Sequence, residues 1–384
     1  MVRVSPLREI HAQAGATYTP YGPPDAAIPV VQARDAFELE YAAIRKSSAL
    51  FDEPHMGVVE VVGADSQDFL SRMLTQKLDD MGAGVSRPSF WLNRQGRIVA
   101  DLRVLVFDKA VLLLCDALTS ASVVETLGAY LFAEDVSLRD MTDSWHRMSL
   151  HGPEAFAILR SVAHDSDALC AALASPGACA QGVIAGERVS FDRSAVTGAT
   201  GLSLIMQSAG ASAVWQTLED AGARPIGWQA LNVARVEAGE PLWNVDFGAD
   251  SLPHETGVVE SRVSLTKGCY LGQEIVARMA SRGKSAKRLC AIRLQRVVAP
   301  ETDSPLQSMT GDAVRLDVTS DPIGAVTSSV VSPLLGDTPI CFAVLSTKHA
   351  DASAKVLIDA QGQQIEGAVQ KQLRFLPASG LSRK

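Results

Sequence analysis

The chain has 384 residues, of which 47% are hydrophobic and 20% are charged. That length and composition allow two or three globular domains, each with a core of its own. The formal net charge of -8 argues against a protein whose main work is to coat nucleic acid, because such proteins carry an excess of positive charge.

The beginning of the chain shows strand and helix signals in mixed order. Residues 57–62 (G-V-V-E-V-V) predict a strand, and helical apolar spacing follows Asp65 and Ser66, either of which can cap a helix. Two apolar runs then flank N-R-Q-G (93–96), a composition that favours a hairpin turn. We expect residues 1–145 to form a first α+β unit.

A second unit is expected over residues 146–284. The stretch M-S-L-H-G-P-E-A-F-A-I-L-R (148–160) predicts a strand, a turn and a helix. A later helical pattern ends on Gly222, and W-Q-A-L-N-V-A-R-V-E-A (228–238) ends before Gly239, as helices often end on glycine. Strand and helix signals recur in the two units in similar order, which is typical of a structural duplication.

Beyond Arg288 the pattern changes to short β-rich runs separated by Pro, Gly and Asp. Examples are L-C-A-I-R-L (289–294) and I-C-F-A-V-L-S (340–346). Such runs suit a small antiparallel barrel, which we expect over residues 285–384. Together the three units predict an α+β protein, with two mixed α/β domains and a C-terminal antiparallel β-barrel.

Six cysteines are scattered through the chain, without a C-x-x-C pair or a His partner at zinc-ligand spacing, so neither a disulfide framework nor a metal site is predicted. Cys269 stands in T-K-G-C-Y-L-G-Q-E (266–274), where the nearby Lys267 could lower the thiol pKa. No histidine that could activate the thiol lies close in sequence, so the role of Cys269 stays open among three interpretations. The thiol is a nucleophile, or it lies in a structured turn whose glycines let the backbone approach a ligand, or it is buried in a turn leading into a helix.

Two further places carry charges that suit a ligand. Arg235 and Glu237 stand two residues apart near the end of a predicted helix, so they face different sides. A carboxylate there could accept paired N–H donors from a heterocycle, and the alternative is a solvated glutamate. Residues 278–288 hold five basic side chains, beginning with Arg278, which either grip carboxylates or phosphates or form a solvated linker.

Taken together, these segments resemble the glycine-cleavage T-protein (aminomethyltransferase) superfamily, and in particular its YgfZ branch. The resemblance runs nearly end to end, from S-P-L-R-E-I-H-A-Q-A-G-A (5–16) through L-H-G-P (150–153) to I-G-A-V-T-S (323–328). The most specific motif is K-G-C-Y-L-G-Q-E (267–274), which matches the YgfZ signature K-G-C-[FY]-x-G-Q-E. Plain aminomethyltransferases tend to have K-x-x-F-I-G there.

The resemblance implies a three-domain cloverleaf around a central channel that binds tetrahydrofolate or a one-carbon derivative. The first two units, 1–145 and 146–284, would then share the folate site. The residues implied for cofactor binding are Glu237, Arg235, Asn93, Tyr270, Gln273 and Arg278. The residues implied for catalysis are Cys269, Asp101 and Lys267.

Departures from the T-protein pattern leave the activity open. N-R-Q-G-R-I-V-A-D (93–101) puts Ala100 where the T-protein tandem of aspartates begins, and Asp101 second. T-G-A-T-G-L-S (197–203) lacks the acids of the T-protein turn T-G-E-D-G-F-E. Because adjacent strand residues face opposite sides, we expect Asp101 to replace the missing carboxylate only if the strand shifts.

Three functions follow as hypotheses. The first is a cytoplasmic, monomeric tetrahydrofolate-binding protein of the YgfZ type, which works with iron-sulfur assembly proteins to mature or repair iron-sulfur enzymes and depends on Cys269. The alternative is a folate-dependent aminomethyltransferase, and a further alternative is a tRNA-modification factor, which the pI near 5.4 weakens. No apolar stretch approaches the roughly 20 residues that span a bilayer, so no membrane segment is expected.

Overall fold

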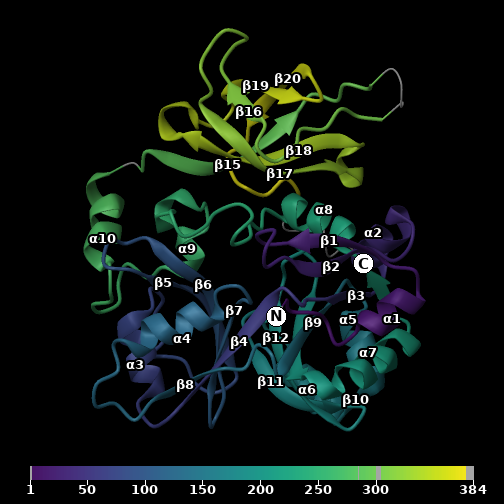
Figure 1. Ribbon diagram of the computed structural model, residues 1–384, viewed down its shortest axis with the longest axis vertical. Coiled ribbons are helices and arrows are strands. Elements are labelled where there is room, and N and C mark those ends of the chain that lie inside the picture. Colours follow the sequence, from purple (N-terminus) through teal and green to yellow (C-terminus); the bar gives the residue numbers. More distant parts are fainter. Residues whose placement is uncertain (1, 284, 300–303, 378–384) are drawn as a thin grey trace.

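The computed structural model describes residues 2–283, 285–299 and 304–377 (Figure 1). The last part of the expected third unit, 378–384, and residues 300–303 lie outside the described residues. Two sheets lie side by side, and a closed barrel sits above them in the view of Figure 1. This mixed α/β arrangement with an antiparallel barrel confirms the fold class that the sequence predicts.

The first sheet has five antiparallel strands in the order β5-β6-β7-β4-β8. Its elements are β4 (Met56–Val62), α3 (Ser66–Met73), β5 (Val85–Leu92), β6 (Ile98–Val106), β7 (Val111–Asp116), α4 (Ser120–Gly128) and β8 (Ser137–Asp140). The strand expected at 57–62 and the hairpin around 93–96 are confirmed. Helices α3 and α4 cover one face, where Phe69 and Leu127 are buried with Ala100 of β6. The opposite, inner face of this sheet looks toward the centre of the molecule.

The second sheet has seven strands in the order β10-β11-β12-β13-β9-β3-β14. Its elements are β3 (Ala49–Asp52), β9 (Trp145–His151), α5 (Ala155–Val162), β10 (Ala163–His164), α6 (Ser166–Ala172), β11 (Cys179–Ile184), β12 (Glu187–Ser194), β13 (Gly201–Gln207), η1 (Ser208–Gly210), α7 (Ala211–Asp220) and β14 (Arg224–Ile226). Helices α5, α6 and α7 cover its outer face, burying Leu159, Leu169 and Trp215. The strand, turn and helix expected at 148–160 are confirmed as β9 and α5.

The N-terminal residues pack with the second sheet. Strand β3 pairs with β9 and β14, and Leu7 is buried in the same core as Leu150. The elements before β3 are α1 (Arg8–Gln13), β1 (Thr17–Tyr21), β2 (Ile28–Ala33) and α2 (Phe37–Lys46). Strands β1 and β2 pair in a two-stranded sheet of their own, and β3 joins the second sheet, although the sequence places all of these residues in one unit over 1–145. The expected boundaries after 145 and 284 stay predictions.

Helix α8 (Trp228–Ala238) joins the second sheet to the barrel and ends at Gly239, as predicted. Gly239 has a φ of 82°, and a Cβ there would lie 2.5 Å from the backbone nitrogen of Arg374. Glycine is therefore needed for the segment after the barrel to lie against the helix end. The chain then runs through η2 (Pro253–Glu255), α9 (Val259–Arg262) and α10 (Gln273–Arg282) to the barrel.

The barrel is antiparallel and closes in the order β15-β18-β17-β16-β19-β20. Its elements are β15 (Lys287–Leu294), β16 (Ala313–Arg315), β17 (Gly324–Ser332), η3 (Pro333–Leu335), β18 (Thr338–Ser346), η4 (Thr347–His349), β19 (Lys355–Ala360) and β20 (Gln363–Val369). The wall formed by β15 and β18 buries Leu289 and Phe342 against Ala230 of α8. After β20 the chain returns to α8, where the backbone N–H groups of Phe375 and Leu376 donate to the carbonyl of Glu237.

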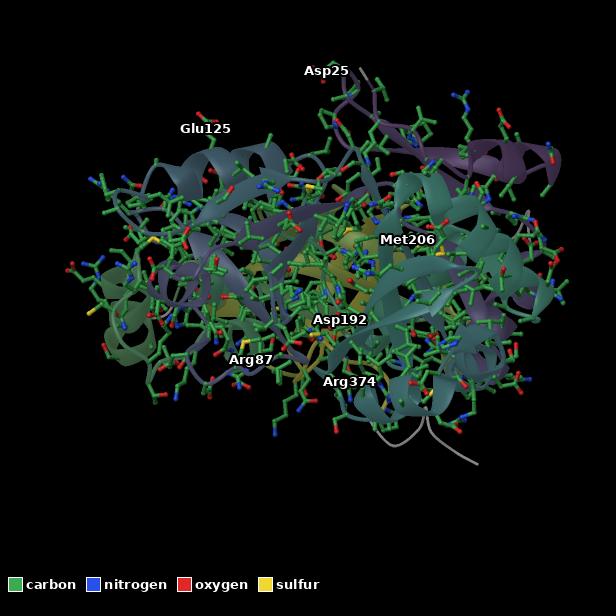
Figure 2. The ribbon with its side chains drawn as sticks, turned by 90° about the horizontal axis from the view of Figure 1, so that it is seen from below. Asp25, Arg87, Glu125, Asp192, Met206 and Arg374 are labelled. Carbon is green, nitrogen blue, oxygen red and sulfur yellow. The ribbon has the colours of Figure 1, made fainter. Side chains whose placement is uncertain are left out.

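The two sheets meet through their inner faces. Leu105 and Leu112 of the first sheet are buried with Ile205 of the second. Farther along, Arg103 of β6 binds the fully buried carboxylate of Asp192 on β12, which Figure 2 labels near the middle of the molecule. A buried ion pair thus joins the two sheets. Among the described residues no helix is long and apolar enough to cross a membrane.

Candidate functional site

Four charged side chains from separate parts of the chain lie close enough for the charges of the other three to act on Glu240, and we call Asp101, Glu240, Arg262 and Arg374 the central polar cluster. Asp101 comes from β6, Glu240 follows α8, Arg262 ends α9 and Arg374 lies in the segment after the barrel. The Asp101 and Arg262 side chains are 15% and 13% exposed. Asp101 and Arg262 are therefore largely buried but within reach of solvent, whereas Arg374 is exposed.

Asp101 faces the centre without any shift of its strand. Ala100 is fully buried in the core beneath α3 and α4, so its neighbour Asp101 must point to the opposite, inner face. The expectation that Asp101 would need a strand shift is therefore wrong. Alternation along a strand says that neighbours face opposite sides, but it does not say which side is the centre. The substitution at position 100 removes no carboxylate from the inner face.

Arg262 fixes the orientation of Asp101. Its Nε donates to Oδ1 of Asp101 at 2.8 Å, and its Nη1 donates to Oγ of Ser261 at 3.1 Å. The guanidinium also lies 5.8 Å from the ring centroid of Phe90. Burial alone would lower the pKa of Arg262, but the charge and hydrogen bond of Asp101, with the charge of Glu240, raise it above its ordinary value. Arg262 is therefore charged, and Oδ2 of Asp101 makes no hydrogen bond to the described residues.

Glu240 is a carboxylate without a direct partner. Burial raises its pKa, while the charges of Arg262 and Arg374 act in the opposite direction. Among the described residues its carboxylate accepts no hydrogen bond and has no cation within 4.0 Å. Burying such a group costs free energy unless a partner compensates it.

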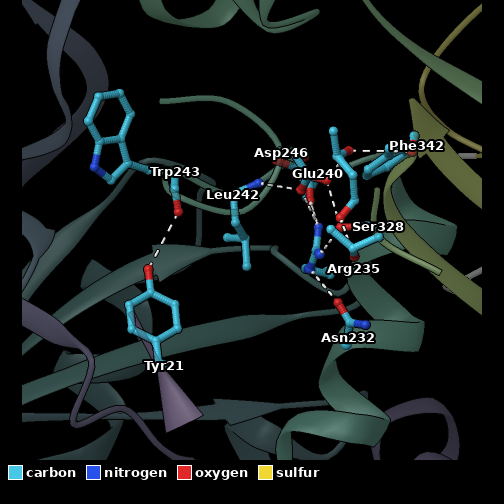
Figure 3. A network of polar contacts seen from close by, with 11 residues as sticks. Tyr21, Asn232, Arg235, Glu240, Leu242, Trp243, Asp246, Ser328 and Phe342 are labelled. Carbon is cyan, nitrogen blue, oxygen red and sulfur yellow. Dashed lines mark hydrogen bonds and ion pairs between the residues drawn. The ribbon is translucent and has the colours of Figure 1, made fainter. Parts of the chain in front are cut away.

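Arg235 and Glu237 are fully buried, and their partners are other protein groups. Arg235 donates to Oδ2 of Asp246 at 2.7 Å, to Oγ of Ser328 at 2.6 Å and to the carbonyl of Glu240 at 3.1 Å (Figure 3). This network ties α8 to the loop after it and to strand β17 of the barrel.

Glu237 points to a different set of partners, as its spacing from Arg235 predicts. The hydroxyl of Tyr41 donates to both carboxylate oxygens, at 2.8 and 2.7 Å, and Ser332 of the barrel donates to Oε1. Arg45 forms an ion pair with Oε2. These contacts hold α2, α8 and β17 together and leave no room on the carboxylate for a heterocycle. The folate role expected for Glu237 and Arg235 stays a prediction that this geometry does not favour.

The K-G-C-Y-L-G-Q-E loop packs against the hairpin between β5 and β6. Gly272, with a φ of 79°, stands where a Cβ would lie 2.6 Å from the carbonyl oxygen of Asn93, so the two turns approach closely. Cys269 is exposed, whereas the other five cysteines are buried. The interpretation of Cys269 as a buried structural residue is therefore wrong.

Lys267 anchors this loop to helix α3. Its ammonium donates to the carbonyls of Leu74 at 2.6 Å and Gln76 at 3.0 Å, and also to that of Ser71. Burial lowers its pKa to about 8, and Asp79 acts in the opposite direction. Its donors are taken by the carbonyls at the end of α3, so the geometry gives Lys267 an anchoring role. Its expected role in activating the thiol stays a prediction.

Replacing Lys267 by methionine is expected to destabilise the protein by about 1–3 kcal/mol, because three carbonyls lose their donor. Chemical unfolding would measure this loss, with Lys109→Met, a change in an exposed hairpin turn, as the control. Unchanged stability together with slower alkylation of Cys269 would contradict the anchoring role and restore the activating one.

The remaining expected residues are spread around the same loop. Tyr270 is buried with Phe90 and Val276, and burial raises its pKa to about 12. The Oδ1 of Asn93 accepts from two backbone N–H groups of its own turn. Gln273 and Arg278 lie on α10, where Arg278 is exposed. The structure thus gathers Asn93, Tyr270 and Gln273 near Cys269, while Glu237 and Arg235 belong to the buried interface with the barrel.

A cavity of about 290 Å³ opens between the N-terminal hairpin, α8 and the barrel. Tyr21 and Trp228 line it together with Thr310 and Thr327. The hydroxyl of Tyr21 donates to Asp116, which lies at the end of β7. Burial raises the pKa of Asp116. The hydrogen bonds from Tyr21, from a backbone N–H and from a side-chain amide act in the opposite direction and lower it. No local motif in the sequence marks this cavity, Glu240 or Arg262, so they are found only in the structure.

Comparison with known proteins finds a solved structure with the same fold and a family model that matches the sequence. It is the fold of the glycine cleavage system aminomethyltransferase T from Bartonella henselae, whose crystal structure matches with a TM-score of 0.82 over 98% of both chains at 21% identity. Residues 7–267 match the family model of the GCVT N-terminal domain. The aminomethyltransferase of Saccharopolyspora erythraea is 30% identical, covering 94% of this chain and 95% of that protein. That of Corynebacterium aurimucosum is 27% identical and covers 94% of each.

The chain therefore belongs to the GCVT (aminomethyltransferase) family. This confirms the superfamily that the sequence resembles. Its assignment to the YgfZ branch stays a prediction, because the relatives matched are named aminomethyltransferases.

Proposed function

We propose that the protein is a tetrahydrofolate-dependent one-carbon transferase of the aminomethyltransferase type. The observation that carries this proposal is Asp101, a half-buried carboxylate on the inner face of β6 with one oxygen pinned by Arg262 and the other available. A carboxylate held in this way can move a proton to or from a reacting amine. The names of the relatives, which cover the chain nearly end to end, support the same class of reaction.

The cavity between the N-terminal hairpin, α8 and the barrel supports a role in folate binding. The cavity beside Tyr21 and Trp228 is large enough for a bicyclic ring and offers aromatic and hydroxyl groups to it. Asp116, reached through Tyr21, and Asp101 stand on neighbouring strands of one sheet, β7 and β6. Tetrahydrofolate, when bound, supplies the nitrogen atoms that carry the one-carbon unit. The protein supplies position, exclusion of water and the carboxylate.

The test is the formation of 5,10-methylene-tetrahydrofolate from an aminomethyl donor by the purified protein. The proposal predicts turnover that depends on tetrahydrofolate. Folate binding without any turnover, with several aminomethyl donors, would contradict it.

A second candidate function is support of iron-sulfur enzymes in the cytoplasm, as proteins of the YgfZ type provide. The specific observation in its favour is Cys269, which is exposed at the tip of a loop that other residues anchor. An exposed thiol in such a place contributes nothing to packing, so it is free to react or to bind.

Replacing Cys269 by alanine is expected to change the free energy of unfolding by less than about 0.5 kcal/mol, as for most surface substitutions. Under the second function, this variant would fail to restore iron-sulfur enzyme activity in a strain that lacks the protein. Full restoration by Cys269→Ala would eliminate the second function and leave the transferase.

A further inference from the structure

Thr75 is a fully buried residue that follows the end of α3. Its backbone N–H donates to the carbonyl of Phe90 at 3.0 Å, and its hydroxyl accepts from the N–H of Phe90 at 2.9 Å. Both backbone groups of Phe90 on this side of β5 are therefore bound by one residue. Phe90 stands directly opposite Asp101 on the neighbouring strand β6, so Thr75 holds β5 at the level of that carboxylate.

The same residue also holds the end of α9, which lies beside β5 (Figure 1). Its hydroxyl donates to the carbonyl of Arg262 at 2.7 Å, and its own carbonyl accepts from the N–H of Ser264 at 3.0 Å. The side-chain amide of Gln76 donates to the carbonyl of Ser261 at 3.0 Å. The backbone of Arg262 is therefore fastened by bonds at this residue, before it and after it.

Lys267 keeps Thr75 in place. Its ammonium donates to the carbonyls of Leu74 and Gln76, the residues directly before and after Thr75, at 2.6 and 3.0 Å. Because the backbone of Thr75 is held on this side as well, its hydroxyl has a fixed position. The hydroxyl then bridges two backbones, those of β5 and α9, that are far apart in the sequence.

Arg262 links this bridge to Asp101. Its guanidinium lies 5.8 Å from the ring centroid of Phe90, and its Nε donates to Oδ1 of Asp101 at 2.8 Å. Among the described residues this is the one hydrogen bond to the Asp101 carboxylate. Since a misplacement of about 1 Å can lower a rate about 100-fold, whatever places Arg262 also affects a proton transfer at Asp101.

We propose that Thr75 is a positioning residue for the one-carbon transfer. Its hydroxyl places Arg262, and Arg262 orients Asp101 so that Oδ2 is left for the reacting amine. This inference rests on the proposed function and adds to it a residue that touches no substrate. A purely structural role of Thr75 would lower stability without changing the catalytic step.

The first test compares two substitutions of Thr75 in the full chain. Thr75→Val removes the hydroxyl and keeps the β-branched shape, whereas Thr75→Ser keeps the hydroxyl. For Thr75→Val we expect a kcat about 10- to 100-fold below that of the wild type, with a nearly unchanged KM for tetrahydrofolate. Thr75→Ser is expected to retain most of the activity. Wild-type kcat in Thr75→Val would overturn the proposal.

Thr126→Val is the matched control. It also removes a hydroxyl that binds a residue of the same sheet, because Thr126 accepts from the indole N–H of Trp91 at 2.9 Å. Trp91 is buried in the core beneath α3 and α4, on the face of the sheet opposite to Asp101. We therefore expect the kcat of Thr126→Val to equal that of the wild type.

Combining substitutions separates positioning from other effects. If Thr75 acts through Asp101, adding Thr75→Val to Asp101→Asn lowers kcat no further, because the carboxylate that needs orienting is already gone. Losses that multiply in the double variant would overturn the proposal.

Crystal structures of the variants give a readout that needs no turnover. We expect Nε of Arg262 to leave Oδ1 of Asp101 in Thr75→Val and to stay there in Thr75→Ser; an undisturbed pair in Thr75→Val would overturn the proposal. If thermal unfolding shows that Thr75→Val does not fold, Thr75→Ala, which also lacks the hydroxyl, replaces it. A wild type without turnover would eliminate the proposed function, while the structures still decide whether Thr75 places the pair.

Discussion

Replacing Glu237 by alanine is expected to destabilise the protein by about 3–5 kcal/mol, because removal of one partner leaves a buried charge without compensation. Glu237 is fully buried and the Arg45 side chain is 6% exposed. In the variant, Arg45 keeps only its hydrogen bonds to neutral groups, such as the carbonyl of Thr197 at 2.8 Å. Tyr41 and Ser332 lose their acceptor as well. Urea unfolding measures the difference.

The control for this prediction is Glu125→Ala on α4, which is expected to stay within about 0.5 kcal/mol of the wild type. Glu237→Gln is expected to fall between the two, because it retains hydrogen-bond acceptors for Tyr41 and Ser332 but not the charge. If Glu237→Ala were as stable as the wild type and had lost only its affinity for tetrahydrofolate, the carboxylate would be a ligand for the folate ring, as the family resemblance implies.

Replacing Asp101 by asparagine is expected to lower the rate of one-carbon transfer by about 10²- to 10⁴-fold, the usual contribution of a positioned acid or base. The asparagine oxygen can still accept the hydrogen bond from Nε of Arg262, so the local geometry is preserved. The affinity for tetrahydrofolate is therefore expected to stay nearly the same. Steady-state turnover and a parallel folate titration separate the two effects.

Asp108→Asn serves as the control, because Asp108 is an exposed residue of the turn between β6 and β7. Its turnover is expected to equal that of the wild type. An Asp101→Asn variant with full activity would mean that another group moves the proton. Asp116, the buried carboxylate bound to Tyr21, would then be the next group to substitute.

Local patterns predict much of the fold, because turns and helix ends depend on a few neighbouring residues. The hairpin at N-R-Q-G, the end of α8 at Gly239 and the antiparallel barrel all follow from such patterns. The place of β3 does not, since a four-residue strand carries no sign of which sheet it will join. Its pairing with β9 depends on contacts about 100 residues apart.

The candidate site is predicted less well than the fold, because its members come together only in three dimensions. Asp101 is found from its place in a motif, but alternation alone cannot say which face of β6 is central. Glu240 and Arg374 are separated by more than 130 residues, and the backbone of Arg374 reaches the end of α8 because Gly239 has no Cβ. Glu237 lies in a motif that the family resemblance links to a ligand, but its contacts in the structure are those of a buried interface.

We expect this molecule to hold a folate for one-carbon transfer. The most direct measurement is a calorimetric titration of the purified protein with tetrahydrofolate under anaerobic conditions. We expect one site per chain with affinity in the micromolar range. Absence of binding under these conditions would contradict it, and would mean that the aminomethyltransferase fold has been kept while its ligand has changed.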